Sequence, residues 1–160
     1  MSAQDLILGA RVAHLRELKT ENSRLKAENA ALKDELDSLK AHLDQTVLAM
    51  EDLKDGAPLE IWDGWNLILG AKKVAASRAD LLAQAKALGR RIWIVFDGPD
   101  EKVKSDGLVR VSYTGGTGAH RADRFIVDFV RAAAYLGLAA QVSVRTNDKD
   151  FLAQIRRILV

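Results

Sequence analysis

The feature that most constrains the fold is a seven-residue repeat of apolar side chains near the amino terminus. Counted with Leu15 at position a, it continues for about five heptads, and neither glycine nor proline interrupts the chain between Arg11 and Asp55. Such a repeat is typical of a coiled coil, in which the a and d side chains of two helices pack together. The a positions are Leu15, Asn22, Asn29, Leu36, Leu43 and Met50, and the d positions are Leu18, Leu25, Leu32, Leu39, Thr46 and Leu53.

The charged positions beside this repeat indicate how the two helices run. The e positions are Lys19, Lys26, Lys33 and Lys40, and the g positions are Glu21, Glu28 and Glu35. In a parallel pair each g residue faces the e residue of the next heptad on the other chain, so every such contact is attractive, whereas antiparallel helices would bring like charges together. Asn22 and Asn29 agree, because buried a-position asparagines pair with their symmetry mates only in a parallel, in-register dimer.

The sequence therefore predicts a leucine-zipper-like parallel homodimer over residues from about Leu8 to Leu53. A further protein partner could also bind through this coiled coil. The alternative is a helix packed on the chain's own domain, which the almost wholly charged e and g positions disfavour.

The amino-acid composition limits the cellular compartments in which such a protein is expected. The 160 residues contain no cysteine, so disulfides and thiolate metal sites are excluded, and this usage fits a reducing cytoplasm. No apolar run approaches the roughly 20 residues that span a bilayer, and the first residues lack the pattern of a signal peptide. We expect a cytoplasmic protein with no membrane partner.

Charge is distributed unevenly about Gly56. Up to that residue there are 8 Lys+Arg against 11 Asp+Glu, a balance of −3, and beyond it 16 against 11, a balance of +5. A basic surface raises the local concentration of phosphate groups and so favours a nucleic acid partner. A solvated surface with spare lysines accounts for the same count equally well.

The helical pattern stops at Asp55-Gly56-Ala57-Pro58, because glycine and proline terminate helices. We therefore place a dimerisation helix and linker in residues 1–56 and a folded domain in residues 57–160. Apolar runs predict four strands, at Leu59–Trp62, Ile92–Phe96, Val109–Tyr113 and Val142–Thr146. Helical patterns lie from Ser77 to Gly89, from Arg121 to Leu136 and from about Asp150 onward, and Pro99 to Leu108 is expected to be a short polar connection. This alternation predicts an α/β domain with a parallel sheet covered on both faces.

Aspartates stand where the predicted strands end. Asp63, Asp97 and Asp148 each follow a strand, and Asp123 lies in the first turn of the long helix. Function gathers at the carboxyl ends of strands in such sheets. Carboxylates crowded together repel one another unless a cation neutralises them, and Mg²⁺ or Mn²⁺ prefers oxygen ligands. Each aspartate also has a structural role open to it as a turn former or helix cap, above all Asp148 before the last helix.

A family resemblance is carried by an ordered set of short motifs. Ile61-Trp62-Asp63-Gly64-Trp65-Asn66-Leu67-Ile68 resembles the opening strand of NYN-domain proteins of the PIN-like superfamily, where Asp-Gly-aromatic-Asn stands at the strand end. The similarity continues in family order through Val95–Gly98, Val109–Thr114, Ala122–Ile126 and Arg145–Asp148. It covers nearly all of Leu59 to Phe151 and is closest to the YacP-like branch. The resemblance implies a PIN-like fold and a metal-dependent endoribonuclease.

The same resemblance implies roles for individual residues. Asp63, Asp123 and Asp148 would bind Mg²⁺ or Mn²⁺, and Asn66 would orient the first aspartate or the substrate. Asp97 matches an acidic position of the YacP-like branch and joins this catalytic and metal-binding set. The candidates for holding the RNA backbone are Lys72, Lys73, Arg121, Arg124, Arg145 and Lys149.

Other interpretations of the domain remain open at this stage. Trp65 could stack a base or pack against the first helix. His120, beside the glycines from Gly115 to Gly118, could contact phosphate but is expected to face solvent. The domain could be a non-catalytic module that binds RNA or recruits a partner, although bare carboxylates hinder the binding of an anionic polymer. A receiver domain or a haloacid-dehalogenase-like phosphatase also uses strand-end aspartates, but the phosphatase needs a second aspartate where Trp65 stands.

Overall fold

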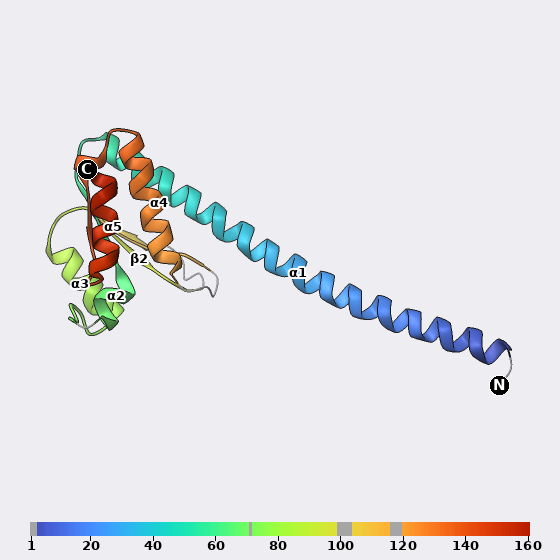
Figure 1. Cartoon of the computed structure of the whole chain (residues 1–160). Coiled ribbons are helices and arrows are strands. Elements are labelled where there is room, and N and C mark those ends of the chain that lie inside the picture. The colour runs from blue at the N-terminus through green and yellow to red at the C-terminus, as the bar shows by residue number, and fades with distance from the viewer. Residues whose placement is uncertain (1–2, 71, 99–103, 116–119) are drawn as a thin grey trace. The chain divides into compact units, whose positions relative to one another are not determined.

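The computed structural model describes residues 3–70, 72–98, 104–115 and 120–160 (Figure 1). The chain divides into two compact units, one reaching to Asp37 and one from Ser38 to Val160. The glycines predicted as a loop at Gly116 and Gly118 lie outside the described residues.

The first element is a single long helix, α1 (Ala3–Lys54), as the heptad repeat predicts. Leu15, Leu25 and Leu32 of the repeat are exposed, with 64%, 45% and 57% of their surface accessible. The helix ends where the sequence predicts a break: the Gly56 amide donates to Leu53 O (3.0 Å) and Gly56 has a φ of 79°, a left-handed conformation that glycine adopts without strain.

The last predicted heptad belongs to the folded domain, which corrects the sequence prediction. Met50 and Leu53, assigned to a and d positions, are 8% and 0% exposed and lie in the same hydrophobic cluster as Leu59 and Ile126. The apolar stripe of α1 therefore continues into the core of the second unit. These two side chains are not available to a partner helix, so any pairing with a second copy must use residues nearer the amino terminus.

The second unit is an α/β domain built on one sheet in the order β3-β4-β2-β1-β5. Four strands are parallel, as predicted: β1 (Leu59–Asp63), β2 (Ile92–Phe96), β4 (Val109–Tyr113) and β5 (Val142–Arg145). A fifth, β3 (Lys104–Asp106), runs antiparallel to β4 at the edge of the sheet. The sequence prediction missed β3, because its three polar residues show no apolar pattern and pairing at an edge does not require one.

Helices cover both faces of the sheet (Figure 1). The helices after β1 are α2 (Gly64–Leu69) and α3 (Arg78–Ala87), and those on the other face are α4 (Arg121–Tyr135) and α5 (Lys149–Leu159), with a 3₁₀ turn at Ala139–Gln141. Strand β2 shows the alternation: Ile92, Ile94 and Phe96 join the cluster beneath α2 and α3, and Trp93 and Val95 join the one beneath α4 and α5. All five residues are buried, which is why this strand is readable as an unbroken apolar run.

Local signals set two further features. Ser77 caps α3 by accepting from the Asp80 amide (3.1 Å), and Asp80 Oδ2 accepts from the Ala76 amide (2.8 Å), so two side chains satisfy amides at the start of this helix. A Cβ on Gly64 would collide with the ring of Phe96, which accounts for a glycine directly after Asp63. None of the helices in the described residues combines the length and apolar character that a membrane crossing requires.

Candidate functional site

The candidate site lies at the carboxyl edge of the sheet, where the strand order reverses. The chain proceeds outward from β1 through β2 to β4 and then returns to place β5 on the other side of β1. In open parallel sheets such a reversal leaves a crevice outside the strand ends, where ligands bind. The last residue of β1 is Asp63, and Thr146 follows the last residue of β5.

Asp63 is the buried carboxylate of this edge. Only 5% of the residue is exposed. Asp63 caps the short helix α2, because its Oδ1 accepts from the Asn66 amide (3.4 Å). Its Oδ2 accepts from the Thr146 hydroxyl (3.0 Å). The side chain is thus fixed by one contact from its own loop and one from across the reversal point.

Burial raises the pKa of Asp63 to about 6. The hydrogen bonds from the Thr146 hydroxyl and the Asn66 amide lower this pKa, and the negative charges of Asp123 and Asp97 raise it. Asp63 therefore lies within electrostatic reach of both acids. A carboxyl group placed this way is poorly stabilised as an anion, and a nearby cation would restore its ordinary acidity.

Asp97 connects the end of β2 to the start of α4. Its Oδ1 accepts from the Thr114 hydroxyl (3.1 Å) and from the Ala122 amide in the first turn of α4. The residue at the helix's own cap position, His120, makes no side-chain cap bond. Asp97 therefore supplies from another element the anionic partner that a helix amino terminus favours.

Asp123 projects from the first turn of α4, where Asp97 holds the helix. Its Oδ2 lies 3.0 Å from Nδ1 of His120, whose side chain is 83% exposed. The sequence prediction of a solvent-facing His120 fits this exposure but missed its contact with Asp123. The three-residue spacing of the pair within one turn is a signal that could have identified it.

Asp148 acts as the amino-terminal cap of α5. Its Oδ1 accepts from the Asp150 amide (2.9 Å) and from the Phe151 amide (3.0 Å), which is the structural alternative that the sequence left open. The Asp148 amide donates to the Thr146 hydroxyl oxygen (3.1 Å). Because that hydroxyl donates to Asp63, Thr146 links the two acids.

Asn66 ties α2 to the loop after β5. Its side-chain Oδ1 accepts from the Asn147 amide (2.7 Å), and its backbone amide contacts Asp63. Asn147 in turn donates through Nδ2 to Lys72 O (2.6 Å). Asn66 thus positions Asp63 through its backbone, whereas its side chain holds the two loops together. Sequence reasoning assigned no role to Thr146 or Thr114, because a threonine beside a strand end has no distinctive pattern.

The predicted RNA-contacting residues surround this edge in different settings. Lys72, Lys73, Arg124 and Lys149 are exposed, in the loop after α2 and in the first turns of α4 and α5. Arg121 is half-buried and donates to Thr114 O (3.4 Å). The Arg145 guanidinium lies 4.7 Å from the centre of the buried Trp62 ring, so it also covers the core.

Trp65 is half-buried and packs against strand β2. Its ring meets Phe96 edge-on at 5.1 Å, and its Nε1 donates to Asp97 O (2.6 Å).

Within the described ranges, no group of three or more histidines, aspartates or glutamates is gathered closely enough to hold a metal ion. Asp63 and Asp123, supported by water and substrate oxygens, would be the donors for a cation that commonly needs only one or two protein carboxylates.

Comparisons with protein-family models, with curated proteins and with solved structures find no match to this chain. The family resemblance therefore rests on the sequence motifs alone.

Proposed function

We propose that the chain is a metal-dependent endoribonuclease of the NYN type, with Asp63 and Asp123 as its principal metal ligands. Asp97 and Asp148 complete the acidic set, each also serving as a helix cap. The proposal includes dimerisation through a parallel coiled coil formed by the exposed part of α1.

The observation that carries this proposal is the position of Asp63: it is buried at the carboxyl end of β1 and bonded to Thr146 from beyond β5, and its raised pKa agrees with this setting. The acid is desolvated at the reversal point of the sheet, and the charges of Asp123 and Asp97 act on it from two other elements. Burial and these like charges disfavour the Asp63 anion, so at neutral pH this carboxylate lowers the stability of the folded state. Perturbed acids in a crevice are typical of functional sites, and carboxylate oxygens are the donors that Mg²⁺ and Mn²⁺ prefer.

The residues fit a hydrolytic role in which the chain binds and orients RNA. Bound there, a divalent cation would polarise the scissile phosphate and make water more acidic. Arg124 and Lys149, exposed in the first turns of α4 and α5, would attract the phosphate backbone. Thr146, through its bond to Asp63, would keep the carboxylate oriented when the site fills.

The test is cleavage of mixed RNA and DNA by the intact chain, with Mn²⁺, with Mg²⁺ and with a chelator. We expect cleavage of RNA that needs the metal and that falls roughly 100-fold or more in Asp63→Asn and Asp123→Asn, because the acids hold the group that stabilises charge. Asp128→Asn is the matched control for Asp123→Asn, since Asp128 is an exposed acid on the same helix, paired with Arg131. It should leave cleavage unchanged.

Two results would contradict the nuclease proposal. Cleavage that persists in the chelator, or that survives Asp63→Asn, would place the chemistry elsewhere. If the wild type cuts no RNA and Mn²⁺ does not raise its melting temperature, while RNA still binds, the domain is the non-catalytic binding module.

A further inference from the structure

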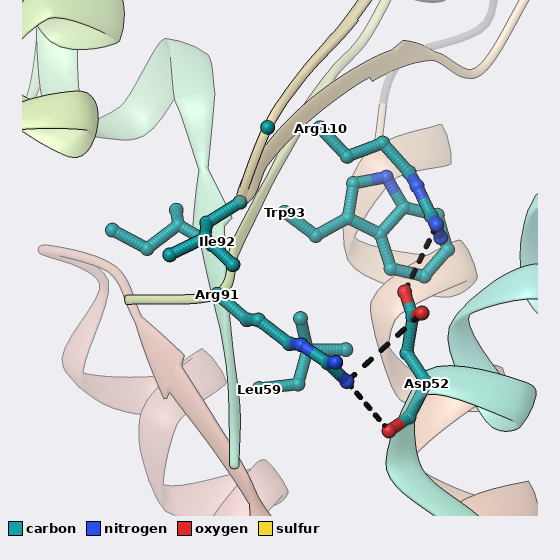
Figure 2. A pocket seen from close by; sticks show the side chains of 8 residues that line it. Asp52, Leu59, Arg91, Ile92, Trp93 and Arg110 are labelled. Carbon is teal, nitrogen blue, oxygen red and sulfur yellow. Dashed lines mark hydrogen bonds and ion pairs between the residues drawn. The ribbon is translucent and has the colours of Figure 1, made fainter. Parts of the chain in front are cut away.

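A second site lies at the opposite edge of the sheet from Asp63. The last turn of α1, the starts of β1 and β2 and the turn between β3 and β4 enclose a pocket of about 290 Å³. Figure 2 shows two arginines, Arg91 and Arg110, directed at one acid, Asp52. All the lining residues belong to the second compact unit.

The charges in this pocket do not balance. Arg91 Nη1 donates to Asp52 O (2.8 Å) and lies 4.0 Å from its carboxylate, and Arg110 Nη2 lies 3.0 Å from Asp52 Oδ2. Two guanidinium groups therefore share a single carboxylate. The neighbouring acids do not supply the missing charge, because Glu60 pairs with Arg90 and Asp106 pairs with Lys86.

The two guanidinium groups have the accessibility and the unused capacity that a ligand needs. The Arg91 and Arg110 side chains are 28% and 18% exposed, so they are reached by solvent but are partly desolvated, which strengthens charge-assisted hydrogen bonds. Each guanidinium has five N–H donors, and the contacts with Asp52 use one nitrogen of each. Arg110 is steadied by the Trp93 ring, 5.8 Å away.

We propose that this pocket binds a phosphate group. Paired arginines suit a tetrahedral dianion, because their planar forks can each bind two of its oxygens. In the structure Asp52 takes the place of one such anionic partner, and the phosphate competes with this carboxylate for both arginines. The pocket volume exceeds what a bare phosphate needs, so it accommodates inorganic phosphate or the phosphate end of a small molecule such as a nucleoside monophosphate.

Because phosphate competes with Asp52, loss of an arginine and loss of Asp52 should change phosphate affinity in opposite directions. Binding of inorganic phosphate and of adenosine 5′-monophosphate is measured by titration calorimetry on the intact chain, at constant ionic strength and at a pH of about 8, where a phosphate monoester is a dianion. Arg91→Gln and Arg110→Gln should each weaken binding about tenfold, as expected for loss of a charged hydrogen-bond donor. Asp52→Asn should strengthen binding, because the competing charge is gone.

Arg157→Gln is the matched control, since Arg157 is an exposed arginine of α5 that is not part of the pocket lining. It should bind phosphate as the wild type does. Arg110→Lys, which keeps the charge and loses the fork, separates simple attraction from bidentate binding and should fall between wild type and Arg110→Gln. Phosphate that binds Arg157→Gln and Arg91→Gln equally, no binding by wild type and Asp52→Asn alike, or weaker binding in Asp52→Asn would overturn the proposal. Tighter binding of the nucleotide than of inorganic phosphate identifies a phosphorylated small molecule as the ligand, and equal binding identifies the free ion.

Discussion

At the scale of single residues, the pKa of Asp63 makes stability depend on pH in a defined window. The folded-state pKa is about 6 against an ordinary value of 3.8, so between these values the folded state binds more protons than the unfolded state. The free energy of unfolding should therefore fall as pH rises from about 4 to about 6, by up to about 3 kcal/mol for a shift of two pKa units. Urea unfolding of the metal-free protein across this range measures it.

The variant Asp63→Asn isolates this contribution. It removes the charge and keeps the shape, and the Thr146 hydroxyl can reverse its hydrogen bond to accept from the new amide. We expect Asn to raise the free energy of unfolding at pH 7 by about 1–3 kcal/mol and to flatten the pH dependence. Asp128→Asn, an exposed control, should leave the pH profile as it is. A wild-type stability that rises through the same window would refute the assignment.

Thr146 offers a second test at this scale. Its hydroxyl lowers the pKa of Asp63 by bonding to Oδ2, so Thr146→Val, which has nearly the same shape, should move that pKa further above about 6. Titration of the Asp63 side chain by carbon-detected NMR would record the change. An unchanged or lower pKa in this variant would mean that the hydroxyl does not stabilise the carboxylate.

At the scale of elements, Asp97 and Asp63 should respond oppositely to loss of charge. Asp97 caps α4 through the Ala122 amide and also contacts Thr114, so Asp97→Ala should destabilise the domain by about 1–2 kcal/mol, as loss of a helix cap does. Amide exchange in the first turn of α4 should accelerate, as followed by hydrogen-exchange NMR. If Asp97 were only a repelling neighbour of Asp63, its removal would stabilise the protein instead.

The strands and helices differ in how well the sequence predicts them. Strand β2 was predicted with its observed bounds, because all of its residues are buried and a five-residue apolar run between polar residues is typical of a buried strand. Helix α2, with six residues, is too short for periodicity to reveal. The candidate site is predicted as a set of strand-end acids, but the sequence does not show that Asp97 caps α4 while Asp63 is buried without a charged partner among the described residues. That Asp97 caps a helix from another element depends on a contact 25 residues along the chain, which no local pattern records.

At the scale of the whole molecule, the same limit applies to the long helix. A heptad repeat identifies apolar positions but not what covers them, so Met50 and Leu53 were assigned to a partner helix although they pack in their own domain. This assignment changes the design of an oligomerisation experiment. A chain beginning at Pro58 would lose these two core residues, and unfolding would be confused with loss of a dimer.

Point variants in the exposed part of α1 avoid this difficulty. Leu18, Leu25 and Leu32 lie at successive d positions and are 52%, 45% and 57% exposed, so in a single chain they contribute little burial. Glu21 and Glu28 pair with Arg24 of the same chain, and in a parallel dimer they would instead face lysines of the other copy. We expect the intact protein to sediment as a dimer at micromolar concentration.

The double variant Leu25→Asp with Leu32→Asp should sediment as a monomer, because each new charge would have to be buried in the seam between the two helices. The urea unfolding of the α/β domain should stay unchanged in this variant. Arg24→Gln, at an outer position, is the control and should remain dimeric. Asn22→Leu should give tighter association with a looser choice of oligomer, because a buried asparagine specifies the parallel pair at a cost in stability. A wild-type chain that sediments as a monomer at every concentration, or a double variant that stays dimeric, would show that the seam does not join two copies.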